Sequence, residues 1–200
     1  MLFICALVIS LGIIGMANAT VLTFDDITTA TGYTSINNYV TGYGGFMWDQ
    51  DWYLMHTPSY SPQSSGYISG TASGDYILFN AYASVVSIND ADFDFNGAYL
   101  TAAWNTDLNI RVRGFDDGVQ IYEQIVTTDT NGPNWFDFDF LGIDQLEFYS
   151  YGGISAGIGG SGEHFAMDDF TVNESVPEPA TCLLLLFGFA GMVGIKKKFS

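Results

Sequence analysis

The stretch Leu108–Val126, LNIRVRGFDDGVQIYEQIV, decides the fold of this chain. The apolar residues Leu108, Ile110 and Val112 alternate with polar ones, and successive side chains of a strand point to opposite faces. The sequence Asp116-Asp117-Gly118 suits a tight turn, and a second alternating run follows it. The stretch therefore predicts an antiparallel hairpin with one buried and one exposed face.

Short runs of the same kind recur on both sides of this hairpin. The chain is rich in Gly, Tyr and Phe, and no segment keeps a helical period. Asn96-Gly97 lies between two runs, 91–95 and 98–104, and predicts a second hairpin turn. The later runs 135–140 and 145–149 are predicted as separate strands. Together these runs predict an all-β fold, an antiparallel β-sandwich of jelly-roll type with about ten strands.

Both ends of the chain are apolar and predict targeting segments. Residues 1–19 are apolar and end in Ala-Asn-Ala, which predicts a cleaved signal peptide, with a retained membrane anchor as the alternative. Residues 180–195 carry no charge and predict a transmembrane helix, which the basic cluster Lys196, Lys197 and Lys198 orients. The predicted domains are a signal peptide at 1–19, a β-sandwich at 20–175 and a sorting segment at 176–200.

The sorting segment opens with Pro177, Glu178 and Pro179, ahead of the apolar run and the lysines. Two prolines keep the backbone extended and unable to join the following helix. This arrangement resembles the PEP-CTERM sorting signal of Gram-negative bacteria. The resemblance implies export, transient tethering in the inner membrane and processing by an exosortase. It also implies release to the cell surface or extracellular matrix, in association with extracellular polysaccharide.

The predicted body is strongly acidic. Arg111 and Arg113 are its only basic residues, and all of the 22 acids except Glu178 lie in it, which gives a formal charge of −19. Such a charge strongly disfavours nucleic acid and anionic membrane surfaces as partners. The two arginines share a strand face, where they pair with carboxylates or hold an anionic sugar. Cys5 and Cys182 lie in the targeting segments, so no disulfide staples the body.

Two acidic pairs are candidate metal ligands. Asp25 and Asp26 follow the first predicted strand, and Asp168 and Asp169 lie in the last. First and last strands of a jelly roll often pair, and calcium binds carboxylate and carbonyl oxygens. The pattern resembles that of galactose-binding-like carbohydrate modules, which implies a structural calcium between these pairs. The alternative is that one acid of each pair caps a turn while the other faces solvent.

A cluster of aromatic and polar residues is the candidate glycan site. Sugar rings stack on aromatic faces while their hydroxyls bond to polar side chains. The alternative is that these aromatics fill the core, as we expect of Trp104 and Trp135. The candidates are Trp48, Asp49, Asp51, Trp52, Tyr53 and Tyr60.

The sequence as a whole predicts a non-enzymatic protein of the cell surface or extracellular matrix with weak glycan binding. Asp92, Asp94, Asp137 and Asp139 alternate with phenylalanine, which is typical of a solvated strand face. Two alternatives remain at this point. One is a structural coat protein without a ligand, and the other is a hydrolase of polysaccharides, which needs two carboxyls at a defined separation.

Overall fold

Strands make up most of the chain in the computed structural model, which describes residues 19–27, 31–61 and 64–173. The predicted signal peptide up to residue 18, the sorting motif and the predicted transmembrane helix at 180–195 lie outside these ranges. Within them, no helix is both long enough and apolar enough to cross a membrane.

The described ranges contain twelve strands, one short α-helix and four 3-10 helices. The strands are β1 (Thr20–Leu22), β2 (Tyr33–Ser35), β3 (Met47–Trp48), β4 (Trp52–His56), β5 (Tyr76–Asn80), β6 (Val86–Ala102), β7 (Asn105–Thr106), β8 (Leu108–Asp116), β9 (Val119–Thr128), β10 (Asn134–Tyr151), β11 (Ile154–Ser155) and β12 (Phe165–Val172). The helices are η1 (Ile36–Asn38), η2 (Tyr43–Gly45), η3 (Thr57–Ser59), α1 (Gly66–Ser69) and η4 (Ala81–Ala83).

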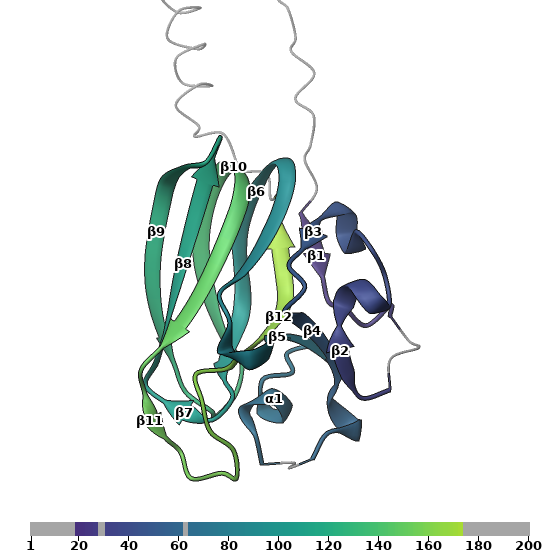
Figure 1. The fold of residues 1–200 in the computed structure, drawn as a ribbon, viewed down its shortest axis with the longest axis vertical. Helices are drawn as coiled ribbons and strands as arrows, with labels where there is room; N and C mark the ends of the chain where they lie inside the picture. The colour runs from purple at the N-terminus through teal and green to yellow at the C-terminus, as the bar shows by residue number, and fades with distance from the viewer. Residues whose placement is uncertain (1–18, 28–30, 62–63, 174–200) are drawn as a thin grey trace, which may run out of the picture. The chain divides into compact units, whose positions relative to one another are not determined.

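Ten of the strands form two layers that share their two longest members, β6 and β10, whereas β7 and β11 pair in a separate two-stranded sheet (Figure 1). One layer follows the order β2-β4-β5-β12 and continues into the second half of β6 and the first half of β10. The other layer places β3 beside the first half of β6, and joins the second half of β10 to β8 and β9. All of these pairs are antiparallel, so the fold is an all-β antiparallel sandwich, as the sequence predicted.

β6 and β10 bend where their pairing is irregular. Three register shifts interrupt the pairing of β10 with β6 between Asp137 and Gln145. Within this stretch Asp139 has φ 50° and Gly142 has φ 60°. The Gly142 N–H is held by the carboxylate of Asp94, at 2.8 Å from Oδ1. Extra residues on one strand of a pair bend that strand, so these bulges allow two strands to serve both layers.

Two strand breaks expected from the sequence are wrong. Asn96-Gly97 was expected to be a turn, but both residues lie inside β6, and Asn96 is 4% exposed. A Cβ atom on Gly97 would lie 2.5 Å from Cζ2 of Trp135, so this glycine allows the indole to approach the strand. The separate strands predicted at 135–140 and 145–149 are one strand, β10.

The hairpin predicted from LNIRVRGFDDGVQIYEQIV is confirmed. β8 pairs with β9 along its whole length. Ile110 and Val112 are 0% exposed, whereas Arg111 and Arg113 on the opposite face are partly exposed. The alternation in the sequence therefore decides which side of this hairpin faces the core and which side faces water.

Edge-to-face aromatic contacts fill the space between the layers. Trp52 is 0% exposed, and its ring centroid lies 5.5 Å from that of Phe148 and 5.7 Å from that of Phe165. Trp48 crosses Trp52 at 6.1 Å with an interplanar angle of 85°. Such arrangements place the positive edge of one ring against the negative face of another. The indole N–H of Trp52 donates to the carbonyl of Ser87 at 3.1 Å, so its one polar group is satisfied in the core.

The burial of Trp52 predicts a large loss of stability on truncation. We expect Trp52→Ala to lower the free energy of unfolding by about 3–5 kcal/mol, because it leaves a cavity in the aromatic core. Chemical denaturation of the full chain, followed by circular dichroism, measures this change. Met47→Ala in the adjacent strand β3 is the control, since Met47 is 67% exposed and its truncation should cost less than about 0.5 kcal/mol. Equal losses in the two variants would contradict this core.

Candidate functional site

The two predicted acidic pairs meet around one loop, residues 72–75. β1 pairs with β12, as expected of the first and last strands, and this pairing brings the two acidic segments close. The hydroxyl of Ser73 donates to Asp169 Oδ1 at 2.6 Å and to Asp25 Oδ2 at 3.4 Å. Asp25 Oδ1 accepts the backbone N–H of Asp75 at 2.8 Å. The acids therefore bind the loop between α1 and β5 to the strands at both ends of the domain.

Asp26 has a different role from its neighbour. Its Oδ1 accepts the phenolic O–H of Tyr43 at 2.6 Å. Burial, and then this bond, raises the pKa of the Tyr43 phenol well above its ordinary value. The backbone carbonyl of Tyr43 in turn accepts the indole N–H of Trp48 at 2.8 Å. Asp26 thus supports the segment that holds one of the core tryptophans.

Asp168 is the buried one of the acidic residues that contact the loop at 72–75, with 0% of its surface exposed. Its Oδ2 accepts the backbone N–H groups of Ala72 and Ser73 at 2.8 and 3.0 Å, and its Oδ1 accepts that of Asp169 at 2.8 Å. Burial raises the pKa of this carboxyl to about 7, because desolvation outweighs the hydrogen bonds that favour the charged form. The nearby charge of Asp169 acts in the same direction as burial.

The hydrogen-bond donors around the loop at 72–75 indicate whether the acidic residues there can bind calcium. Calcium takes about six to eight oxygen ligands. The groups that point at the carboxylates of Asp25 and Asp168 are mainly backbone N–H groups, whose positive ends compete with a cation. This arrangement does not fit a calcium site. Among the described residues, the carboxylates that bring three oxygens within 4.8 Å of one another are instead those of Asp116 and Asp117 at the tip of the β8–β9 hairpin and Asp144 of β10.

The predicted glycan-binding residues separate into buried and exposed groups. Trp48 is 5% exposed and Trp52 is 0% exposed, and both indole N–H groups are bonded to backbone carbonyls. Asp49 serves the turn between them, since its Oδ1 accepts the N–H of Asp51 at 2.8 Å. The structure thus places the two tryptophans in the core, the alternative that the sequence left open, and a sugar ring cannot stack on them in this conformation.

Tyr53 and Tyr60 lie instead on an exposed group of rings over β2, β4 and η4. The phenolic oxygen of Tyr53 lies 3.1 Å from that of Tyr82, which is 74% exposed. Tyr60 meets Tyr33 with a centroid distance of 6.0 Å, and Tyr33 is 58% exposed. We call these four residues the tyrosine surface. Their rings meet edge to face, at 78° for Tyr53 and Tyr82 and at 72° for Tyr33 and Tyr60.

A cleft of about 340 Å³ opens where β9 ends and β10 begins. Its volume falls within the range of about 300–1,000 Å³ that is usual for small-molecule sites. Trp135, 38% exposed, is its largest side chain. The cleft is lined by Asp107, Thr127, Thr128, Asp129, Asn134, Trp135 and Phe136.

Short-range contacts fix the position of the indole of Trp135 in this cleft. Its Nε1–H donates to Asp137 Oδ1 at 2.6 Å. Its ring meets that of Tyr99 at 5.3 Å and 67°, and the ring rests on the bare backbone of Gly97. An aromatic side chain that is held in place loses little conformational entropy when a ligand binds. The ring is therefore suited to recognition.

The polar side of the cleft is also held by hydrogen bonds. The amide of Asn134 donates to Thr128 Oγ1 at 3.3 Å. Thr127 Oγ1 donates to Asn109 Oδ1 at 2.9 Å. Asp129 Oδ1 accepts the N–H of Asn131 at 2.8 Å, which closes the turn that leads to β10. The cleft thus combines the indole of Trp135 with carboxylate, amide and hydroxyl groups, the mixture that was expected around residues 48–53.

The sequence contained a signal for this cleft that the prediction missed. In WFDFDF, Trp135 has the same parity as Asp137 and Asp139 and the opposite parity to the phenylalanines. Since alternate residues face opposite sides of a sheet, this parity places Trp135 on the polar face. The expectation that Trp135 belongs to the core is therefore wrong, whereas Trp104, 6% exposed, does belong to it.

The raised pKa of Asp168 predicts how stability changes with pH. The folded state keeps the proton up to about pH 7, while the unfolded chain loses it near the ordinary value of 3.8. The free energy of unfolding should therefore fall as pH rises from about 4 to about 7, by at most about 4 kcal/mol, and stay level above. The difference between wild type and Asp168→Asn in chemical denaturation isolates this effect. A difference that stays constant through the window would contradict the assignment.

The N–H groups around the acidic loop lead us to expect no stabilisation by calcium. Thermal unfolding of the full chain should give the same midpoint in about 1 mM calcium chloride and in about 1 mM EDTA, because a ligand stabilises only the state that binds it. A midpoint several degrees higher in calcium that Asp25→Asn and Asp169→Asn abolish would instead support the calcium site predicted from the sequence.

Comparisons with solved structures include similarities to carbohydrate-binding modules, of which three are described below. A Clostridium perfringens ZmpB structure with a catalytic domain and two CBM51 domains matches with a TM-score of 0.32 and 15% identity, over 50% of this chain and 11% of that one. CBM51 from Clostridium perfringens GH95, in complex with methyl-galactose, matches with a TM-score of 0.32 and 13% identity, over 50% and 72%. TmCBM61, in complex with β-1,4-galactotriose, matches with a TM-score of 0.34 and 12% identity, over 65% and 87%. All three TM-scores lie below 0.5.

The sequence comparison locates a sorting signal. No curated protein matches this sequence. The model of the PEP-CTERM protein-sorting motif matches residues 175–198. These residues include Pro177, Glu178 and Pro179 together with the three lysines that follow the apolar run. The chain therefore carries a PEP-CTERM protein-sorting motif, as the resemblance predicted.

Proposed function

We propose that this chain is an exported, non-enzymatic protein of the cell surface or extracellular matrix, and that its jelly-roll-type body binds a glycan. The sorting motif at 175–198 supports export. It implies that the precursor passes through the inner membrane and is processed by an exosortase. Extracellular polysaccharide is then the partner that the body meets after release.

The cleft around Trp135 is the observation that carries the binding proposal. A partly exposed indole, fixed by Tyr99 and Asp137, offers an apolar ring face for the C–H face of a sugar. Asp107 and Asp129 line the same cleft and accept hydrogen bonds from sugar hydroxyls. Small-molecule sites combine one apolar surface with a few placed polar groups, as this cleft does.

The alternative, a structural coat protein without a ligand, gives the exposed indole and its cleft no function. A rigid indole that is 38% exposed beside a cleft of about 340 Å³ contributes less to folding than a buried one. Binding of a sugar would bury the exposed part of that ring. The binding proposal thus accounts for a position that packing alone leaves unexplained.

Trp135→Ala tests the proposal. We expect wild type to bind at least one member of a neutral glycan array, and the variant to bind it at least tenfold more weakly, a loss of about 1.4 kcal/mol or more. The full chain is used in a detergent without a sugar headgroup, so that the detergent does not compete. Circular dichroism checks that the variant is folded.

Tyr82→Ala on the tyrosine surface is the matched control, since it also removes an exposed aromatic ring. It should leave the affinity unchanged within about twofold. Loss of binding in Tyr82→Ala but not in Trp135→Ala would move the site to the tyrosine surface. No binding to any glycan would favour the coat protein, and release of reducing sugar from polysaccharide would favour the hydrolase.

A further inference from the structure

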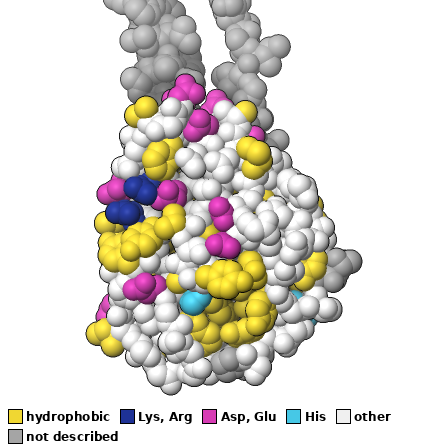
Figure 2. Space-filling model, in the orientation of Figure 1, with side chains coloured by type: hydrophobic (Ala, Val, Ile, Leu, Met, Phe, Trp, Pro, Cys, Tyr) yellow, Lys and Arg dark blue, Asp and Glu magenta, His cyan; other side chains and the backbone are white. Residues whose placement is uncertain are grey.

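The outer face of β8 carries both arginines of the described residues. The register places Arg111 opposite Tyr149 of β10, and Arg113 opposite Glu147. Figure 2 shows the two basic side chains next to each other, bordered by acidic and hydrophobic side chains. In a body of formal charge −19, this is the one place where the described residues present positive charge.

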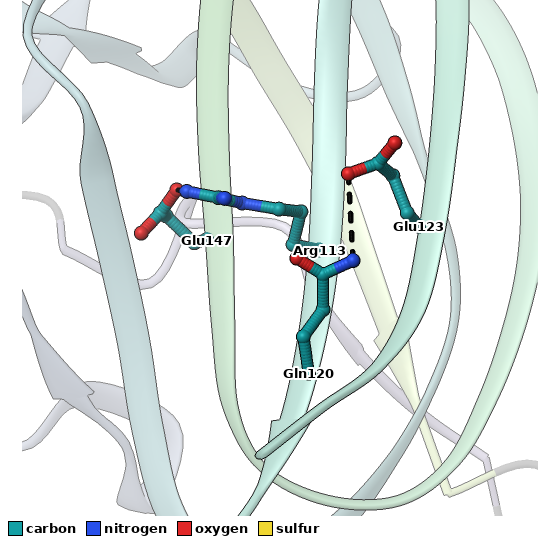
Figure 3. Close-up of polar contacts among 4 residues, drawn as sticks. All are labelled: Arg113, Gln120, Glu123 and Glu147. Carbon is teal, nitrogen blue, oxygen red and sulfur yellow. Dashed lines mark hydrogen bonds and ion pairs between the residues drawn. The ribbon is translucent and has the colours of Figure 1, made fainter. Parts of the chain in front are cut away.

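Arg113 is neutralised by its neighbour. Its Nε donates to Glu147 Oε1 at 3.1 Å, and its Nη2 donates to the same oxygen. Figure 3 shows the guanidinium directed at Glu147, while Gln120 on the adjacent strand bonds to Glu123 at 3.4 Å. The charge of Arg113 is therefore already used within the protein.

Arg111 lacks such a partner. Among the described residues, no carboxylate lies within 4.0 Å of its guanidinium nitrogens, and its buried Nε has no hydrogen-bond partner. Its guanidinium carbon lies 5.1 Å from the ring centroid of Tyr149. A guanidinium that stacks on an aromatic face keeps the N–H groups in its own plane available for a carboxylate. Arg111 thus has no carboxylate partner among the described residues, and its N–H groups are available to the anionic group of a ligand.

Aromatic and polar side chains continue from Arg111 toward the cleft. Tyr149 and Tyr151 stack with a centroid distance of 5.4 Å and an interplanar angle of 17°. Asn109, two residues from Arg111 on the same face of β8, accepts the hydroxyl of Thr127, which lines the cleft. Two residues of a strand span about 7 Å. One oligosaccharide can therefore reach both the cleft and Arg111.

We propose that Arg111, supported by Tyr149, binds the carboxylate of a uronic acid, so that the glycan bound by this protein is an acidic one. The inference rests on the proposed glycan-binding function and names the class of its ligand. The negative charge of the body repels such a ligand over long range, but physiological salt screens charges beyond about 8 Å. The contact with Arg111 acts at hydrogen-bond distance and is screened much less.

The experiment compares acidic probes with their neutral methyl esters. Trigalacturonate and trimannuronate, each as the free acid and as the methyl ester, are titrated against the full chain at about 0.15 M salt, in a detergent without a sugar headgroup. We expect wild type to bind at least one free acid about tenfold more tightly than its ester, because a hydrogen bond between a guanidinium and a carboxylate is stronger than one to a neutral ester. Arg111→Gln should abolish this preference, and Arg111→Lys should restore part of it.

The double variant Arg113→Gln with Glu147→Gln is the matched control, because it removes the neighbouring ion pair without a change in net charge. It should keep the preference for the free acid. Equal affinity for acid and ester in wild type overturns the inference, while loss of both affinities in Trp135→Ala then still supports glycan binding. A wild type that binds none of the four probes also overturns the inference. The proposed glycan-binding function itself fails only if the neutral glycan array shows no binding either. A preference that survives Arg111→Gln places the carboxylate elsewhere.

Discussion

The body depends on two long strands, β6 and β10, that belong to both layers of the sandwich. Each bends where bulges interrupt their pairing, and the aromatic core lies between their two halves. The sequence has no cysteine between Cys5 and Cys182, so the described body has no disulfide to join its layers. The layers are instead continuous through the backbone of these strands, and the rings packed around Trp52 and Phe95 fill the space that this continuity encloses.

The sequence could predict which side of a strand faces the core, but not where the strands bend. The parity of Ile110 and Arg111 is a local property, and the structure preserves it. Bulges in β10 depend on which residues the partner strand offers, and Asn96-Gly97 has turn chemistry but lies against an indole from another strand. For the same reason a cluster such as WDQDWY does not disclose its burial. Trp48 and Trp52 flank a tight turn, and only the packing of both layers shows that their rings point inward.

Acidic residues have two roles in this protein. Most of them lie at the surface, where like charges oppose association between copies of the chain. Asp25 and Asp168 act inside the structure as acceptors for the backbone of one loop, which would otherwise have unpaired N–H groups. The convergence of the first and last acidic segments was accessible from the sequence. That their partners are N–H groups was not, because the loop between α1 and β5 reaches them only in the folded chain.

The distribution of the four tryptophans has a practical consequence. Trp48, Trp52 and Trp104 are at most 6% exposed, whereas Trp135 is 38% exposed. A quencher dissolved in water therefore reaches a single indole, the one beside the cleft. Quenching of this indole would therefore report a ligand that covers the cleft, without an added label.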